Sequence, residues 1–102
     1  MCMALAALTL APHAATAEDC PTLLHLHGYL TVAVSRCGLV EASGVVDAAS
    51  ACRAQAGPDA AAGMATDGVR FAVGEIAAKG GEPSWCKFVQ GEYPSLFGSR
   101  RR

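Results

Sequence analysis

The chain has 102 residues, a net charge of −1 and a hydrophobic fraction of 52%, and its length fits one domain. Its charges are uneven: residues 1–17 carry none, residues 18–99 carry five Lys or Arg and nine Asp or Glu, and residues 100–102 are all arginine. A mildly acidic body argues against a nucleic-acid-binding face, which is strongly basic. We therefore expect no nucleic-acid partner.

Residues 1–17 are typical of a secretory signal peptide. A short apolar run, Ala4 to Leu10, is broken by Pro12, and Ala15-Thr16-Ala17 supplies the small residues that a signal peptidase requires. The run is too short to span a bilayer. We therefore expect cleavage after residue 17, a periplasmic or secreted product, and no transmembrane segment in the mature chain. A buried N-terminal helix is the alternative interpretation.

The first helical pattern covers residues 20–37. Pro21 suits a first helical turn, because proline lacks an N–H that would be unpaired there. The apolar stripe recurs at intervals of three and four residues: Leu23, Leu26, Leu30 and Ala33/Val34. Gly28 predicts the close approach of another backbone, and Gly38 is a natural end for the helix. The β-branched residues leave a short strand over residues 29–34 as an alternative.

Two further helices and a last turn follow. Ser43 is the expected N-cap of a helix that ends at Gly57. The next helix is expected over Ala60–Lys79, and its small residues predict tight helix packing: Ala61, Ala65, Gly68 and Ala72. A short helical turn begins at Glu82 and ends at Tyr93. The prediction is an all-α fold, a small three- to four-helix up-down bundle over residues 18–97, with a frayed basic tail at residues 98–102.

Four cysteines remain after the expected cleavage, Cys20, Cys37, Cys52 and Cys86. An even number in a small exported domain predicts two disulfides, and no CxxC pair of the kind found in structural zinc sites is present. A helix over residues 20–37 would hold its ends roughly 25 Å apart, which excludes a bond between Cys20 and Cys37. Folding the helices up, down and up favours Cys20–Cys52 with Cys37–Cys86. The pairing Cys20–Cys86 with Cys37–Cys52 remains open.

Residues that could carry chemistry are few. His25 and His27 would share a face only in a strand, where they could join a copper or zinc site; on a helix they point to different sides. No serine lies in a G-x-S-x-G context, and the glycines match no phosphate-binding loop. We expect no enzyme activity and no cofactor, with a small hydrolase as the weakest alternative.

Aromatic residues gather near the end of the chain: Trp85, Phe88, Tyr93 and Phe97. They predict either a hydrophobic lid on the bundle, because small domains need every large side chain in the core, or an exposed patch that binds a protein or a lipid.

Several short motifs carry a resemblance: the L-x-x-x-G-Y run that ends at Gly28-Tyr29, Cys37-Gly38 and Trp85-Cys86. Together with the leader, they resemble small, all-helical exported proteins of proteobacteria that carry two disulfides. The pattern is more remotely similar to helical periplasmic immunity proteins and to acid-stress chaperones of the HdeA type. The resemblance implies a compartment and a fold, and it implies no activity.

We therefore expect an exported binding protein, such as an inhibitor, immunity factor, chaperone or accessory subunit, with a protein partner in the cell envelope. Trp85, Phe88, Tyr93 and Phe97 are the expected partner-binding residues. A periplasmic metal-binding module that uses His25 and His27 is the alternative.

Overall fold

The computed structural model describes residues 19–98, which form four α-helices and a final 3₁₀ turn. The helices are α2 (Cys20–Cys37), α3 (Ser43–Ala56), α4 (Pro58–Ala78) and α5 (Glu82–Glu92), and the 3₁₀ turn η1 covers Pro94–Leu96. The predicted small all-α bundle is confirmed. No helix in residues 19–98 has the length and apolar character needed to cross a membrane. The expected signal peptide and residues 99–102 lie outside the described residues.

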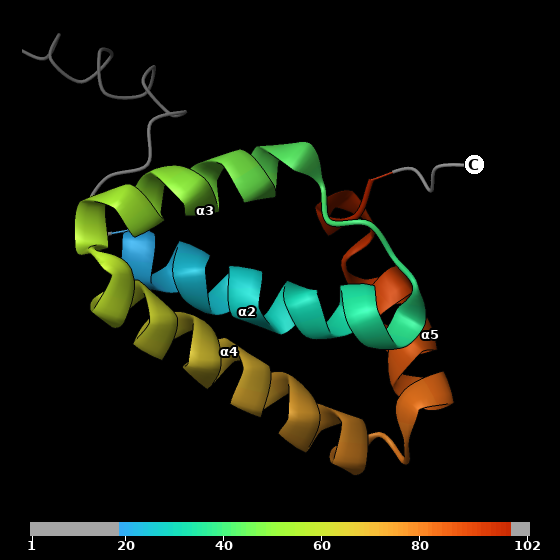
Figure 1. The fold of residues 1–102 in the computed structure, drawn as a ribbon. Coiled ribbons are helices and arrows are strands. Elements are labelled where there is room, and N and C mark those ends of the chain that lie inside the picture. Colours follow the sequence, from blue (N-terminus) through green and yellow to red (C-terminus); the bar gives the residue numbers. More distant parts are fainter. Residues whose placement is uncertain (1–18, 99–102) are drawn as a thin grey trace, which may run out of the picture.

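Helix α2 is the centre of the bundle and contacts each of the other three helices. Figure 1 shows α3 running back along one side of α2, α4 running forward along the other, and α5 at the end where α2 finishes. The buried residues of α2 therefore cover more of its circumference than the predicted apolar stripe. They include Leu24, Gly28, Tyr29, Leu30, Val32 and Ala33. The alternative of a strand over residues 29–34 is wrong, because these residues continue α2.

The helix ends follow their sequence signals in most cases. Gly38 has a left-handed backbone (φ 69°), and its N–H donates to the carbonyl oxygen of Val34, as predicted for a helix C-terminus. The N-cap prediction for Ser43 is wrong, because Ala42 occupies that position and Ser43 is the first helical residue. Helix α4 starts at Pro58, directly after Gly57, and proline is well suited to a first turn. Helix α5 has 11 residues, more than the predicted short turn.

The two disulfides join Cys20 to Cys52 and Cys37 to Cys86, with Cα–Cα distances of 5.3 and 5.6 Å. The favoured connectivity is confirmed. Both ends of α2 are cysteines, so one disulfide fixes α3 to the start of α2 and the other fixes α5 to its end. The two disulfides overlap along the sequence, because Cys52 lies between Cys37 and Cys86.

The core has two parts. The smaller one surrounds the Cys20–Cys52 disulfide and contains Leu24, Ala49 and Ala61. The larger one lies toward α5: Tyr29, Leu30, Val32, Ala33, Ala72, Trp85 and Val89.

The chain after η1 also packs on this end. The Ala42 N–H donates to the carbonyl oxygen of Leu96 (2.9 Å), and the Gly98 N–H donates to that of Val40 (2.7 Å). Gly98, assigned to the frayed tail by the sequence, is therefore held in place by a backbone hydrogen bond.

Candidate functional site

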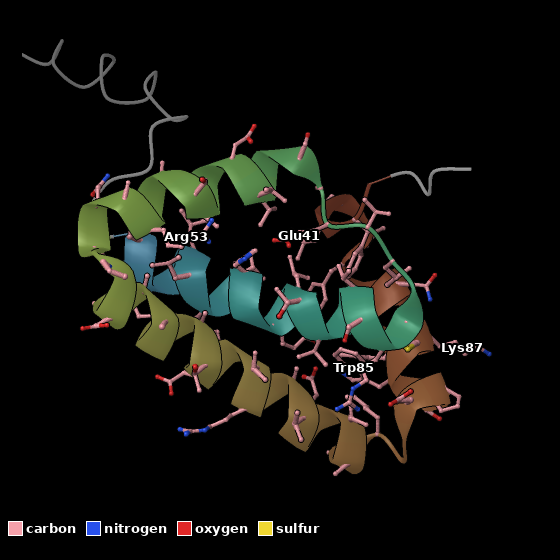
Figure 2. All side chains as sticks on the ribbon, in the orientation of Figure 1. Glu41, Arg53, Trp85 and Lys87 are labelled. Carbon is pink, nitrogen blue, oxygen red and sulfur yellow. A yellow bond between two sulfur atoms is a disulfide. The ribbon has the colours of Figure 1, made fainter. Side chains whose placement is uncertain are left out.

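A partly buried carboxylate joins three helices beside the larger core. The Glu75 carboxylate accepts a hydrogen bond from the Tyr29 hydroxyl (2.5 Å) and another from Nε1 of Trp85 (3.0 Å). Figure 2 shows Trp85 in the space between α2, α4 and α5. Because a buried donor without a partner is costly, one carboxylate from α4 fixes the orientation of two rings from two other helices.

The same contacts alter the acidity of the phenol. Burial of the ring and the hydrogen bond to the Glu75 carboxylate raise the pKa of Tyr29 well above its ordinary value of 10.0. Both effects act against the phenolate, because ionisation would place a second negative charge beside the carboxylate in a poorly solvated site. Tyr29 is therefore a fixed neutral donor at physiological pH.

Tyr29 forms the floor of a surface groove of about 240 Å³, which we call the aromatic groove. It is lined by Thr22, His25, Leu26, Tyr29, Phe71, Tyr93 and Leu96. The Tyr29 ring centroid lies 5.9 Å from that of Phe71 and 6.3 Å from that of Tyr93. Phe71 is 54% exposed and Tyr93 is 36% exposed. The groove therefore combines a rigid floor with two accessible aromatic walls, and it can hold an apolar group.

The four aromatic residues singled out from the sequence separate in the structure. Tyr93 lines the aromatic groove, and the Phe88 ring meets it edge-on at 6.2 Å. The ammonium group of Lys79 lies 4.0 Å from the centre of the Phe88 ring. Trp85 is fully buried, so its side chain supports the groove from below and does not reach the surface. Phe97 lies away from the groove, in a separate depression beside Leu39.

Sequence reasoning did not place Tyr29 or Phe71 on a binding surface, and it singled out His25 only as a possible metal ligand. Phe71 lies between the buried residues Gly68 and Ala72 of α4, but its own side chain is exposed. Tyr29 adjoins Gly28 in the sequence, and its buried position shows that α2 is covered on more than one side. The signal that was present in the sequence is Phe71, an aromatic residue in a helix whose predicted packing residues are small.

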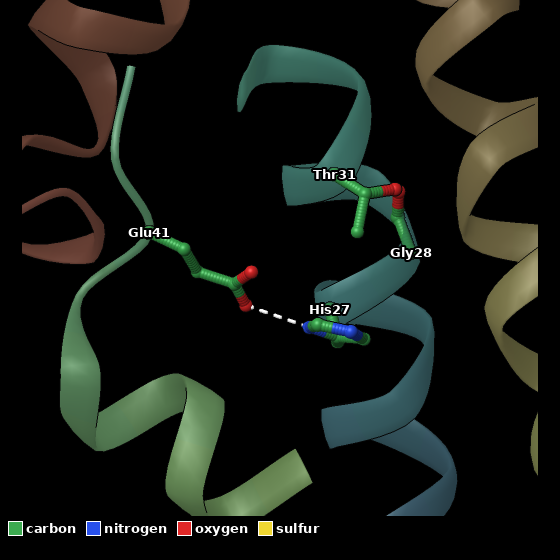
Figure 3. A network of polar contacts seen from close by, with 4 residues as sticks. All are labelled: His27, Gly28, Thr31 and Glu41. Atoms are coloured by element: carbon green, nitrogen blue, oxygen red, sulfur yellow. Dashed lines mark hydrogen bonds and ion pairs between the residues drawn. The ribbon is translucent and has the colours of Figure 1, made fainter. Parts of the chain in front are cut away.

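The two histidines point to different neighbours, as expected on a helix. The His25 ring packs against Phe71, with centroids 5.9 Å apart. His27 instead pairs with Glu41, whose carboxylate oxygen lies 2.8 Å from its Nδ1 (Figure 3). Within residues 19–98, no three side chains of His, Cys, Asp or Glu gather into a group able to hold a metal ion. This arrangement gives the metal-binding alternative no common site for both histidines.

Comparison of the chain with protein-family models, with curated proteins and with solved structures found no match.

Proposed function

We propose that the protein is a small exported binding protein that holds an apolar side chain of a protein partner in the aromatic groove. The observation that carries this proposal is the exposure of Phe71 (54%) and Tyr93 (36%), which both lie next to the buried Tyr29 in the lining of the groove. Aromatic side chains in preformed pockets supply much of the binding energy of protein interfaces.

The size of the groove favours a protein segment over a free small molecule. Its volume of about 240 Å³ is below the range of roughly 300–1,000 Å³ that is usual for small-molecule sites. It is sufficient for one leucine, methionine or phenylalanine side chain, with the rest of the partner lying over Phe71 and Tyr93. The floor needs no rearrangement, because Glu75 already fixes the Tyr29 hydroxyl, and preorganisation lowers the cost of binding.

Two features support export. Two disulfides are typical of small domains in oxidising compartments, and residues 1–17 have the composition of a secretory leader. We therefore place the interaction in the periplasm or outside the cell, with an inhibitor, immunity factor, chaperone or accessory subunit as the functional types that fit.

The experiment is affinity capture from a cell-envelope extract with the oxidised protein as bait. The double variant Phe71→Ala/Tyr93→Ala is the test bait. Val46→Ala on α3 is the matched control, because Val46 is similarly exposed (39%) but does not line the groove. We expect a protein that is retained by the wild type and by Val46→Ala and lost with the double variant.

Equal retention by all three baits would place the interface elsewhere on the molecule. Retention of no protein by the wild type would count against the binding function itself. Circular dichroism of each bait checks that the helices are intact.

A further inference from the structure

A second hollow lies on the other side of α2, between α2, α3 and α4, and we call it the α2–α4 cleft. Its volume is about 320 Å³, within the range of small-molecule sites. Small and apolar residues form much of its lining: Leu24, Gly28, Ala61, Ala65 and Val69. The two groups that can carry a positive charge there are His27 from α2 and Arg53 from α3. No aspartate or glutamate is among the described residues that line it.

The cleft exists because α3 is poor in large apolar side chains. The buried residues of α3 are Ala49 and Cys52, which are both short. The side chain that α3 adds to the lining of the cleft is Arg53. The hollow beside the contact between Gly28 and Ala65 is therefore left open, and Arg53 contributes a cation to its lining.

Arg53 has no ion pair with any acidic side chain in residues 19–98. Figure 2 shows it on the side of α3 that faces α2. By contrast, Arg36 pairs with Glu82 and Arg70 with Asp67. A guanidinium group presents a planar set of donors that matches a carboxylate in two-point contact, so the cleft has an unused anchor for one carboxylate.

His27 is already engaged by another residue. The Glu41 side chain is only 8% exposed, and its carboxylate lies 2.8 Å from Nδ1 of His27. An ionised carboxylate only accepts hydrogen bonds, so Nδ1 carries the proton in this pair. Nε2 is left on the side of the ring away from Glu41 (Figure 3). In this tautomer Nε2 is a hydrogen-bond acceptor, so Arg53 is the side chain of the cleft lining that can pair with an anion.

We propose that the α2–α4 cleft binds a small organic monocarboxylate with a compact apolar body. The carboxylate pairs with Arg53, and the apolar body lies over Gly28, Ala61 and Ala65. A cavity of about 150 Å³ is enough for a benzene ring, so the cleft has room for a ring or a branched chain together with the carboxylate. One unpaired arginine matches one negative charge.

The test is titration of the oxidised protein with benzoate, followed by ¹H–¹⁵N NMR shifts. Benzamide has the same shape without the charge and serves as the ligand control. We expect benzoate to shift resonances of the cleft residues and to bind at least about tenfold more tightly than benzamide. Arg53→Gln should weaken benzoate binding by about tenfold or more. Arg70→Gln is the matched control, since it removes the same charge from an exposed position on α4 and should leave the affinity unchanged.

A second variant tests the cavity itself. Ala62 lines the cleft but is exposed, so Ala62→Leu should fill the hollow without disturbing the core and should abolish binding. Equal affinity for benzoate and benzamide would overturn the proposal, as would an unchanged affinity in Arg53→Gln. Inorganic phosphate binding as tightly as benzoate would overturn the requirement for an apolar body. Phe71→Ala, which tests the aromatic groove, should leave benzoate binding intact, so the two proposals fail separately.

Discussion

The carbonyl oxygen of Ala65 on α4 lies only 2.0 Å from the position that a β-carbon at Gly28 on α2 would occupy. The relationship is repeated in the other direction, because a β-carbon at Gly68 would lie 1.9 Å from the carbonyl oxygen of His25. Both obstacles are backbone atoms, which cannot move aside as a flexible side chain can. The two glycines therefore set how closely α2 and α4 approach.

Substitution of either glycine should separate these helices. We expect Gly28→Ala or Gly68→Ala to lower the free energy of unfolding by at least about 2 kcal/mol, because an added methyl group must displace a helix backbone. Gly74→Ala is the matched control in α4, since nothing lies within 4 Å of its added β-carbon. It should raise stability by about 0.5–1 kcal/mol through lower backbone entropy in the unfolded chain. Urea denaturation followed by circular dichroism measures both changes, and a neutral Gly28→Ala variant would contradict the close packing.

The two disulfides should differ in their resistance to reduction. Cys20 and Cys52 are 4% and 0% exposed, whereas Cys37 and Cys86 are both partly exposed. Because exchange requires a thiolate to reach a sulfur atom, mild reductant should open Cys37–Cys86 first. Partial reduction, alkylation and peptide mapping give the order. Earlier labelling of Cys20 and Cys52 would mean that the smaller core opens more readily than its burial indicates.

Loss of the Glu75 carboxylate should leave Nε1 of the buried Trp85 without its acceptor. We expect Glu75→Ala to destabilise the protein by about 1–3 kcal/mol, the usual cost of an unsatisfied buried polar group. Glu92→Ala, at the exposed end of α5, is the control and should have little effect. Trp85 is the one tryptophan of the chain, so its fluorescence during urea denaturation reports this site directly. Equal stability of the two variants would show that water replaces the carboxylate.

The pKa of Tyr29, raised above its ordinary value of 10.0 by burial and by Glu75, predicts an alkaline loss of stability. The folded state holds this proton more tightly than the unfolded state, so the contribution to stability is fully present below pH 10 and declines as the pH rises above it. We expect Tyr29→Phe to remove this part of the pH dependence. Denaturation curves between pH 9 and 11 measure it, and parallel slopes for the wild type and the variant would contradict the assignment.

The sequence predicts the fold better than the site, for physical reasons that can be traced to particular residues. The length of the helix between Cys20 and Cys37 excluded a bond between these two cysteines. The up-down-up order of the helices then favoured the observed connectivity over the one alternative that stayed open. The close approach at Gly28 was predicted because a glycine in a helix otherwise only costs stability. These signals are local or depend on simple chain geometry.

The aromatic groove depends on contacts between α2, α4 and the chain after α5, and no local pattern records these. Trp85 and Tyr93 are only eight residues apart, yet one is fully buried and the other lines the surface. The Glu75 carboxylate, which comes from another helix, accepts a hydrogen bond from Nε1 of the buried Trp85. Sequence periodicity contains no information about such a hydrogen bond.

The overlapping order of the two disulfides has a consequence for a protein that meets proteases. Hydrolysis of any single peptide bond between Cys20 and Cys86 leaves at least one sulfur bridge across the break. A nick in the connection between α2 and α3, for example, is spanned by both bridges. The nicked molecule would keep its mass, apart from one added water. Its four helices would stay covalently linked until a reductant opened the disulfides.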